Sequence, residues 1–499
     1  MSSLVPLPVI VPLLGAAFGV LVAPWRAVQR TISLVALSAN GVVGVVLMAH
    51  VDDDGMAVMQ AGGWEAPLGI TLAVDRLSAV MLVVSSAMLL VVFVYAVGQG
   101  AEESRYAAFN PVYLVLAAGV SASFVTGDLF NLFVAFEMML VASYVLLTIG
   151  GRPGQVRSGM SYVVISLIAS TFFITALALI YAATGTVNMA ELAERIPELS
   201  AGVRTGFSLL LILVFGIKAG LFPLFFWLPD SYPTAPGAIT AVFAGLLTKV
   251  GVYAIIRSQT LLFPPDAQQG SFLLVLAGLT MVVGVLGALA QDDLRRMLSF
   301  HIVSHIGYMI FGLALFTLAG IAGAVFYVVH HIVVKTALFL VAGLVERRAG
   351  SERLSRIGGL VRSAPMIAVL FALPALSIAG LPPFSGFVGK FALVGSGIES
   401  DEWAIVAVSL LVSLLTMYVM VRIWNGVFWG EPEDPAVAEW IASPDSRVPR
   451  LMSGATVAVV TLSVALMVFA GPLYDYAKRT AGDLLAPESY VESVIGDHR

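Results

Sequence analysis

Apolar segments long enough to cross a lipid bilayer follow one another along almost the whole chain. A transmembrane helix needs about 20 mostly apolar residues, whereas a strand of a membrane barrel alternates between apolar and polar residues. Because the apolar runs are continuous, we expect about fourteen transmembrane helices and an all-α integral membrane fold. The expected spans are 4–23, 31–50, 74–97, 109–126, 130–149, 160–184, 205–227, 236–258, 271–290, 300–319, 321–345, 365–394, 403–429 and 452–472.

The composition supports the same fold class and excludes several functions. Only 11% of the residues are charged, against about 25% in soluble proteins. The chain has no basic stripe with interleaved aromatic residues, so nucleic-acid binding is not expected. The absence of cysteine excludes disulfides and thiolate metal sites. The first apolar segment has no basic region before it and no clear cleavage site, so we interpret it as a retained first helix.

The positive charges predict how the chain is oriented, because cytoplasmic loops carry an excess of lysine and arginine. With the N-terminus outside, the loops expected inside hold Arg26, Arg30, Arg105, Arg152, Arg157, Arg295, Arg296, Arg347, Arg348, Arg353, Arg356, Arg362, Arg447 and Arg450. The regions expected outside hold only Arg195, Arg204, Arg257, Lys478, Arg479 and Arg499. An even number of spans then returns the C-terminus to the outside.

Four of the five lysines lie inside the apolar segments. They are Lys218, Lys249, Lys335 and Lys390, and only Lys478 lies in an ordinary polar stretch. A charged side chain at the centre of a bilayer costs about 3 kcal/mol on insertion scales. Together with Glu137 and the adjacent His330 and His331, the four lysines indicate a polar track through the membrane. Titratable groups arranged in series in hydrocarbon are what proton transport requires.

Three residues of this track lie in the first half of the chain, and each also has a structural interpretation. Glu137 is either a proton carrier paired with a lysine or part of an ion pair that locks two helices. Lys218 lies five residues before Pro223 and is either a relay station or a cap for carbonyls freed at a helix break. Lys249 has apolar residues on both sides, which makes snorkelling difficult. We favour the relay role for all three, because a carboxylate at changing distance alters how firmly a lysine holds its proton.

The second half of the chain supplies the remaining candidates. His331 and Lys335 are four residues apart and share one face of a helix. Histidine titrates near neutrality and suits a shuttle between lysines. Adjacent residues of a helix point about 100° apart, so His330 and His331 do not line one path equally. We expect at least one of them to act as a relay, and Lys390 to be the terminal station toward one surface.

Two segments are interrupted in a similar way. Residues 215–236 read FGIKAGLFPLFFWLPDSYPTAP, and residues 374–391 read PALSIAGLPPFSGFVGKF. Each combines glycine, proline and one lysine, and proline interrupts the hydrogen bonding of a helix. Paired interruptions in the two halves of a membrane protein indicate inverted repeats with a site near the midplane. The repeats would comprise spans four to eight and nine to thirteen.

Other polar residues receive structural interpretations. His301 and His305 have an H-x-x-x-H spacing, which we interpret as a polar, water-lined helix face rather than a zinc site, because no acid or third ligand is near. Asp75 is expected to cap a helix start. Residues 292–296 are expected to form a solvated loop with an internal ion pair between its aspartates and arginines. No cofactor site and no metal site are predicted.

Four stretches closely resemble one family of membrane proteins. They are TGDLFNLFVAFEMMLVASYVL (126–146), GIKAGLFPLFFWLPDSYPTAPGAITAVFAGLLTKVGVYAI (216–255), QDDLRRMLSFHIVSHIGYM (291–309) and GLPPFSGFVGKF (380–391). The chain resembles the antiporter-like family over roughly residues 70–460. This family comprises the large proton-channel subunits of respiratory complex I and the large subunits of Mrp-type cation/proton antiporters. The blocks FPLFFWLPDSYPTAP and TGDLFNLF are most similar to the D-type members of the Mrp branch.

The resemblance implies a fold and a set of site residues. The family fold has fourteen helices in which TM4–8 and TM9–13 are inverted five-helix repeats and helices TM7 and TM12 are broken. By position, its helix-five glutamate corresponds to Glu137, its helix-seven and helix-eight lysines to Lys218 and Lys249, its helix-eleven histidine region to His330 and His331 with Lys335 nearby, and its helix-twelve lysine to Lys390. The chain would then divide into N-terminal helices (1–100), a translocation core (109–429), and a loop, last helix and short tail (430–499).

The resemblance also implies a function and partners. We expect a proton-translocating subunit of a multisubunit sodium/proton antiporter in a bacterial cytoplasmic membrane, a transporter rather than an enzyme, in contact with membrane lipid. Its partners would be H⁺, Na⁺ and other Mrp-type subunits similar to A, B, C, E, F and G. The alternative is a proton-pumping subunit of a complex I-like or membrane-hydrogenase redox complex. A structural scaffold, in which the polar residues only lock helices, is the third possibility. A short polar tail in place of the long lateral helix of the longest complex I relative favours the antiporter.

Overall fold

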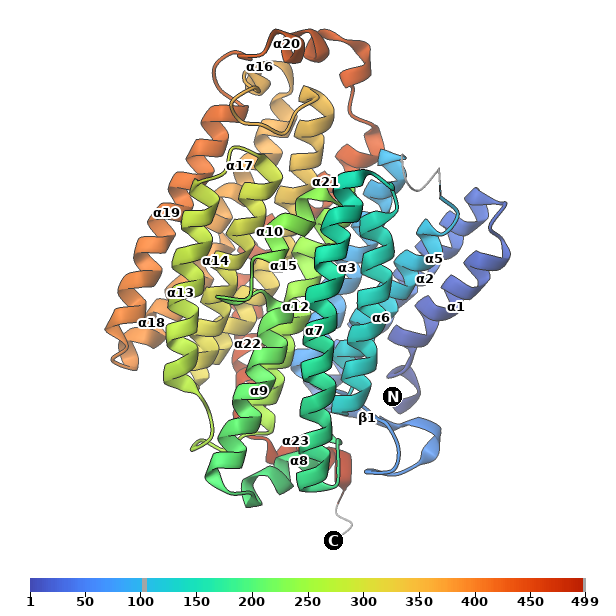
Figure 1. Cartoon of the computed structure of the whole chain (residues 1–499), viewed down its shortest axis with the longest axis vertical. Helices are drawn as coiled ribbons and strands as arrows, with labels where there is room; N and C mark the ends of the chain where they lie inside the picture. Colours follow the sequence, from blue (N-terminus) through green and yellow to red (C-terminus); the bar gives the residue numbers. More distant parts are fainter. Residues whose placement is uncertain (101–105, 497–499) are drawn as a thin grey trace.

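The computed structural model describes residues 1–100 and 106–496, and these form mostly helices that run along one long axis (Figure 1). Twelve helices in this part of the chain are long and apolar enough to cross a membrane. Two shorter apolar helices, Phe109–Val125 and Pro365–Ala379, occupy the places of the remaining two expected spans. The prediction of an all-α membrane fold is therefore confirmed. Arg105 and Arg499 of the charge pattern lie outside the described residues.

The element bounds follow the apolar segments closely. The α-helices are α1 (Leu7–Leu21), α2 (Arg26–Asp54), α3 (Arg76–Gln99), α5 (Phe109–Val125), α6 (Leu129–Thr148), α7 (Pro153–Thr184), α8 (Met189–Arg195), α9 (Ala201–Ala219), α10 (Trp227–Ser231), α11 (Gly237–Val242), α12 (Thr248–Leu261), α13 (Gly270–Leu289), α14 (Leu294–Ala314), α15 (Leu318–Ala349), α16 (Leu360–Ser363), α17 (Pro365–Ala379), α18 (Ser385–Glu399), α19 (Trp403–Val427), α20 (Pro435–Ala442), α21 (Arg450–Val468), α22 (Ala470–Leu485) and α23 (Glu488–Ile495). Short 3₁₀ turns are η1 (Ser2–Leu4), η2 (Ala61–Gly63), η3 (Ile196–Glu198), η4 (Tyr232–Thr234) and η6 (Pro444–Ser446), and η5 (Phe243–Leu247) is a π-helix. Strands β1 (Ala57–Gln60) and β2 (Thr71–Val74) form one antiparallel pair.

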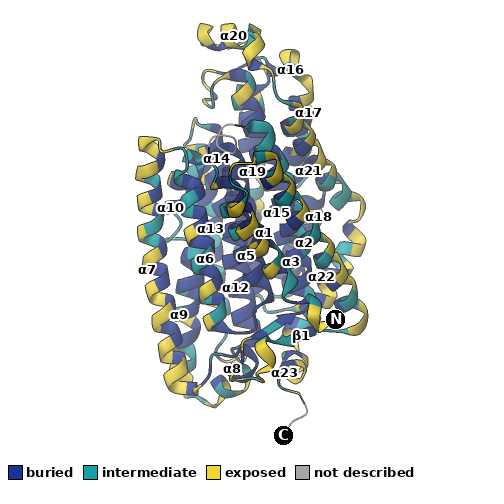
Figure 2. Ribbon diagram, turned by 90° about the vertical axis from the view of Figure 1, so that its right-hand side faces the viewer, coloured by how far each residue is buried: buried dark blue, intermediate teal, exposed yellow. Residues whose placement is uncertain are grey.

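The two chain ends lie at the same end of the molecule, and α16 and α20 lie at the opposite end (Figure 1). Buried residues fill the middle of the bundle, and exposed residues follow the outer helices such as α7 and α9 (Figure 2). The most apolar windows of 237–261 and α15 are completely buried, whereas those of α1 and α2 are one-third buried. The segment 237–261 and α15 therefore form the axis around which the other helices pack.

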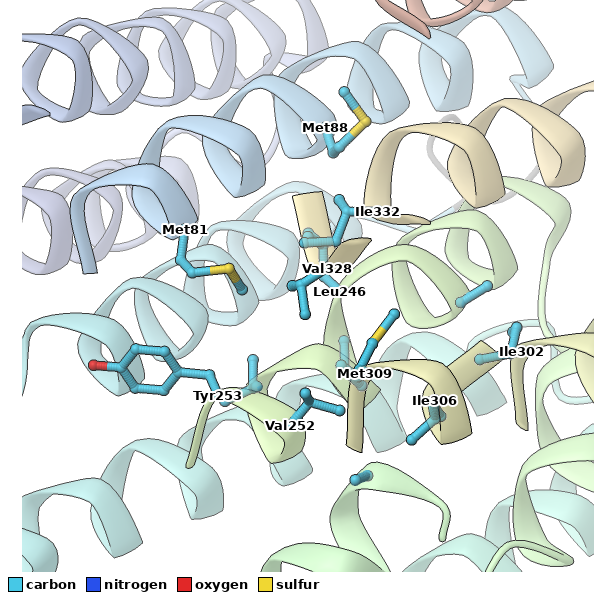
Figure 3. Close-up of a cluster of buried hydrophobic side chains, with 14 of the residues drawn as sticks. Met81, Met88, Leu246, Val252, Tyr253, Ile302, Ile306, Met309, Val328 and Ile332 are labelled. Atoms are coloured by element: carbon cyan, nitrogen blue, oxygen red, sulfur yellow. The ribbon is translucent and has the colours of Figure 1, made fainter. Parts of the chain in front are cut away.

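An apolar cluster joins the central helices. Met81 of α3, Leu246 of η5, Ile306 of α14 and Ile332 of α15 contribute to it (Figure 3). Within this cluster the ring of Tyr253 lies at the edge, and its hydroxyl points away from the other labelled side chains (Figure 3). The cluster fixes how the central helices are rotated about their axes, because a buried helix surface packs with few voids.

Both predicted helix interruptions are present. Helix α9 ends at Ala219, and α17 ends at Ala379. Each is followed by a glycine with a left-handed backbone, Gly220 with φ +81° and Gly380 with φ +85°. Glycine adopts this conformation without the strain that a Cβ atom would add. Prolines follow within three residues, at Pro223 and at Pro382, so each helix stops there and restarts several residues later.

The π-helix η5 was not predicted. It joins α11 to α12 within one continuous helical segment, and a π turn adds one residue relative to an α-helical turn. Gly245 in this turn faces α15, where a Cβ atom would lie 2.4 Å from the hydroxyl oxygen of Thr336. The small residue therefore lets α15 approach the π turn closely.

The polar segment after the last expected span is also helical. Helices α22 and α23 continue from α21 and pack against α15, α12 and α8. The rings of Tyr474 in α22 and Phe326 in α15 lie 6.0 Å apart. What the sequence suggested to be a short tail therefore covers part of the core.

Candidate functional site

Glu137 and Lys218 lie on the neighbouring helices α6 and α9, but among the described residues no ion pair within 4.0 Å joins them. The Ser170 hydroxyl of α7 donates a hydrogen bond to the Glu137 carboxylate. The Lys218 ammonium lies 6.0 Å from the centroid of the Phe136 ring. It is also within electrostatic range of the Glu137 carboxylate. The two groups are thus electrostatically coupled without direct contact.

A small cavity of about 30 Å³ adjoins Lys218. Its lining includes Tyr162 and Ser166 of α7, Trp227 of α10 and Leu247 of η5. A cavity of this size accommodates a water molecule, and the Tyr162 and Ser166 hydroxyls provide polar partners for it. The cavity extends from Lys218 to the π turn that precedes Lys249.

Lys249 is completely buried at the start of α12. Its ammonium donates to the Ala244 carbonyl oxygen at 2.6 Å and to the Thr248 hydroxyl at 3.2 Å. Ala244 lies in the π turn, where the hydrogen-bond pattern of the α-helix is interrupted. The turn therefore provides a carbonyl that holds the lysine inside the bundle, and the side chain does not snorkel to a surface.

Lys335 of α15 contacts a histidine that the sequence placed on a merely polar face. Its Nζ atom shares a hydrogen bond of 2.7 Å with Nδ1 of His301 in α14. The rings of His301 and His305 are 4.4 Å apart, and Nδ1 of His305 shares a hydrogen bond with the Tyr327 hydroxyl. All of these residues are fully buried. The structure thus brings His301 and His305 into the same group as Lys335.

The two adjacent histidines of α15 point in different directions, as the sequence predicts. The ring of His331 lies 5.4 Å from that of His305 and within electrostatic range of Lys249 and Lys335. His330 instead shares a hydrogen bond of 2.9 Å with the Ser385 hydroxyl at the start of α18. His331 therefore lies near both lysines, and His330 faces the second helix break.

Lys390 of α18 lies at that break. Its ammonium donates to the Ala379 carbonyl oxygen at 3.2 Å and to the Ser413 hydroxyl of α19 at 2.9 Å. It also lies 5.1 Å from the centroid of the Tyr308 ring, which is 5.5 Å from the ring of Tyr327. Contacts of the Tyr308 and Tyr327 rings therefore connect the histidine group to Lys390, while the Tyr308 hydroxyl donates to the Ser409 carbonyl oxygen.

Several residues of this arrangement were missed from the sequence. His301 and His305 carry a usable signal, because two histidines four apart on an apolar helix present a polar stripe to one neighbour. Tyr308 and Tyr327 carry no such signal, since a tyrosine in an apolar helix is usually a core residue. Within residues 1–100 and 106–496, no group of three or more histidine or carboxylate side chains is placed to bind a metal ion.

The interpretation of residues 292–296 as a solvated loop with an internal ion pair is wrong. Arg295 is buried and pairs with Glu346 and, at 3.0 Å, with Glu352. Arg296 pairs with Asp230 at 2.9 Å. Helix α14 begins beside carboxylates of other segments, so its two arginines pair with these and not within residues 292–296. Asp75 caps α3 as predicted, with its side chain accepting from the Ser78 amide, but it also pairs with the buried Arg257.

Comparisons with a family profile and with individual relatives indicate the same family. The profile of the family described as NADH:quinone oxidoreductase/Mrp antiporter, transmembrane region, matches residues 126–416. The D subunit of the Na⁺/H⁺ antiporter of Alkalihalophilus pseudofirmus is 43% identical, over 99% of this chain and 100% of the relative.

Two solved structures extend the comparison. A chain in the structure of the Mrp complex from Dietzia sp. DQ12-45-1b is similar with a TM-score of 0.92 and 34% identity, over 99% of each chain. A chain of the membrane-bound sulfane sulfur reductase, an archaeal respiratory membrane complex, is similar with a TM-score of 0.88 and 25% identity, over 98% of this chain and 99% of that one.

Proposed function

The chain belongs to the NADH:quinone oxidoreductase/Mrp antiporter family, and we propose that it is the proton-translocating subunit of a multisubunit sodium/proton antiporter. One observation carries the proposal: a series of titratable side chains, half-buried at Lys218 and buried from Lys249 onward, runs through the bundle to Lys390. Buried charges in a membrane are costly, and they mark ion and proton pathways.

The proposed path has two parts that meet at the centre. Glu137, Lys218 and Lys249 form the first part, in which the cavity beside Lys218 leads to the π turn of Lys249. Neighbouring ammonium groups repel each other, so a proton that arrives at one lysine favours release of the proton held by the next lysine.

The second part of the path begins at His331. From there protons pass to Lys335 and through the histidine and tyrosine groups of α14 and α15 to Lys390. His330 lies beside this route at Ser385. Inward proton flow along the path would be coupled to sodium export, which is an antiport reaction.

The partners follow from the family. The antiporter relative from Alkalihalophilus pseudofirmus and the similar chain in an Mrp complex support assembly with further membrane subunits, similar to A, B, C, E, F and G. The concentration of arginines at the end that carries α16 and α20 supports an orientation with this end in the cytoplasm and both termini outside.

The test is sodium-dependent collapse of a pH gradient in everted membrane vesicles that carry the assembled complex. Lys249→Ala and Glu137→Ala are expected to abolish the sodium response while the complex still assembles. Lys478→Ala is the matched control, because Lys478 is the lysine outside the track and pairs with Asp475 at the surface. If all three variants keep the wild-type response, the track is structural and the proposal is wrong.

A redox-driven proton pump is the second candidate function. It is favoured by the likeness to a chain of the sulfane sulfur reductase, a respiratory complex. In the same vesicles, a wild-type complex that ignores sodium but acidifies the lumen when a respiratory electron donor is added would support this candidate and contradict the antiporter.

A further inference from the structure

A cavity outside the proposed path opens at the end of the molecule that carries both termini. Its volume is about 190 Å³. The end of α2, the start of α3, the end of α12 and the C-terminal helices α22 and α23 surround it. Charged and hydroxyl side chains line it, among them Asp75, Arg257, Thr260 and Ser493. We call this cavity the terminal vestibule.

The inner wall of the terminal vestibule is a buried ion pair. Nη2 of Arg257 lies 2.7 Å from Oδ1 of Asp75, and the two residues are only 4% and 8% exposed. The guanidinium lies against two aromatic rings, 5.5 Å from the centroid of Tyr253 and 5.3 Å from that of Tyr490. A pair at this depth is expensive unless further hydrogen bonds complete it.

The hydroxyl groups of Ser78 and Tyr253 form hydrogen bonds beside this pair. Arg257 donates to the Ser78 hydroxyl at 3.3 Å, and the Ser78 and Tyr253 hydroxyls share a hydrogen bond of 3.1 Å. The Tyr253 hydroxyl also donates to the Phe124 carbonyl oxygen at 3.0 Å. It points away from the apolar cluster, at the edge of which its ring lies (Figure 3).

The same face of α12 leads to the proposed proton path. Lys249, Tyr253 and Arg257 are spaced four residues apart, so their side chains project from one side of the helix. Eight residues of α-helix rise about 12 Å, which is the axial separation of Lys249 from Arg257. One polar stripe therefore joins the terminal vestibule to the buried lysine of the π turn.

We propose that the terminal vestibule is the aqueous opening through which protons reach Lys249 from the side of the membrane that carries both termini, and that the Tyr253 hydroxyl is the link between them. This inference rests on the proposed function. For the transfer, the hydroxyl turns from the Phe124 carbonyl oxygen toward Lys249, releases its proton there and takes another from the Ser78 hydroxyl, so it stays neutral. The Arg257–Asp75 pair has no net charge and holds Ser78 and Tyr253 in place.

The C-terminal helices form the outer wall of the opening. Arg76 at the start of α3 binds Asp483 of α22 at 2.7 Å and Asp52 of α2 at 3.0 Å. Arg479 of α22 binds Asp52 at 2.7 Å. These pairs fasten α22 beside the vestibule, and their charges keep its mouth polar.

Accessibility of engineered cysteines tests the opening, because the chain contains no cysteine of its own. Thr260→Cys places a thiol in the wall of the vestibule at a residue that is 5% exposed. Ser258→Cys is the matched control on the same helix, at a residue that is 3% exposed and does not line the cavity. Ser493→Cys at the exposed rim reports which side of the membrane the vestibule faces.

The assembled complex is treated with a membrane-impermeant, charged thiol reagent on each side in turn. We expect Thr260→Cys to be modified from the same side as Ser493→Cys, with loss of sodium-driven proton movement, and Ser258→Cys to stay unmodified. An unmodified Thr260→Cys, or one that is modified and still transports, overturns the inference. A wild-type complex without any sodium response contradicts the proposed function instead, while the labelling pattern still reports on the opening.

A second pair of variants covers the case in which Thr260→Cys does not assemble. Tyr253→Phe removes the linking hydroxyl and keeps the ring. Tyr113→Phe is its control, since this buried tyrosine donates to the Leu89 carbonyl oxygen at 2.7 Å and lies outside the stripe. We expect Tyr253→Phe to lose most of the transport rate at equal thermal stability of the two complexes. Equal transport by the two variants overturns the inference.

Discussion

Nζ of Lys335 lies 2.7 Å from Nδ1 of His301, and both side chains are completely buried. When Lys335 is protonated its ammonium group only donates, so Nδ1 of a neutral His301 ring is then the acceptor and Nε2 carries the ring proton. Among the described residues, Nε2 of His301 has no protein partner. The lysine thus sets the tautomer of the histidine, and the free N–H edge is available to pass a proton to the next group.

His301→Gln tests whether the Nε2–H group of His301 takes part in proton transfer. Glutamine still accepts a hydrogen bond from Lys335 but does not titrate, so we expect sodium-driven proton movement to fall about 100-fold or more, in the range that proton-transferring groups contribute. Initial rates in vesicles with equal amounts of assembled complex measure this.

The control for this variant is His50→Gln. His50 pairs with Asp54 at 2.8 Å near the end of α2, away from the buried group, and its loss should leave the rate unchanged. A His301→Gln complex that transports at the wild-type rate would mean that the hydrogen bond alone is required.

Most of the fold could be predicted because its signals are local. Continuous apolar runs mark the spans, and glycine next to proline marks both helix breaks. The buried lysines stand out because each is costly in hydrocarbon. These statements need no knowledge of which helix packs against which.

The contacts of the site depend on how helices are rotated against each other, and the sequence does not show this. Lys335 and His301 lie on different helices, so no periodicity links them. The π turn at 243–247 adds one residue and shifts every later side chain by about 100°, so the face of Lys249 cannot be counted from the start of the segment. Arg295 lies in a polar stretch that is typical of a loop, but it is buried and pairs with Glu346 and Glu352 of other segments.

Gly245→Ala tests the close packing of α15 on the π turn. A Cβ atom at this position would lie 2.4 Å from the Thr336 hydroxyl oxygen, so the Thr336 side chain must turn away from its hydrogen bond to the Ile332 carbonyl or the two helices must move apart. Overpacking of this kind costs about 1–3 kcal/mol. We expect a lower thermal unfolding temperature of the assembled complex and a weaker sodium response, because Lys249 and Lys335 move apart.

Gly206→Ala in α9 is the matched control for that substitution. No atom lies within 4 Å of a Cβ atom at Gly206, and alanine favours the helix over glycine by roughly 0.5–1 kcal/mol. The unfolding temperature should therefore stay the same or rise. If Gly245→Ala behaves in the same way, the close approach of the two helices is not required.

Ser413→Ala removes one of the two hydrogen-bond partners of the Lys390 ammonium and leaves the Ala379 carbonyl. A hydrogen bond to a charged group contributes about 1.5–3 kcal/mol, which corresponds to roughly a 10- to 100-fold effect when it is fully expressed in the rate. We expect slower proton movement at unchanged assembly. Ser409→Ala is the control, one turn earlier on α19, because the Ser409 hydroxyl bonds to the Val406 carbonyl of its own helix. Equal rates for the two variants would show that the hydrogen bond from Lys390 to Ser413 does not contribute to the rate of proton movement.

Glu352→Gln tests the charge cluster at the end of the molecule opposite to the termini. Burial and the neighbouring Glu346 carboxylate raise the pKa of Glu352 above its ordinary value of 4.5, although Arg295 opposes the shift. Two carboxylates that share one guanidinium favour retention of a proton on one of them.

The sign of the pH dependence follows from this. Below pH 4.5 the group is protonated in both the folded and the unfolded chain, and its contribution to stability is fully present. As the pH rises toward the higher folded pKa, the unfolded chain releases the proton first, so stability falls by at most about 1.4 kcal/mol per pH unit. Glutamine does not ionise, and the variant lacks this fall. The unfolding temperature of Glu352→Gln minus that of the wild type should therefore increase from pH 5 upward and then level off.

Glu439→Gln, at an exposed position of α20, is the control, and its unfolding temperature should follow the wild-type curve in parallel. A difference for Glu352→Gln that is constant with pH would show that Arg295 keeps both carboxylates ionised.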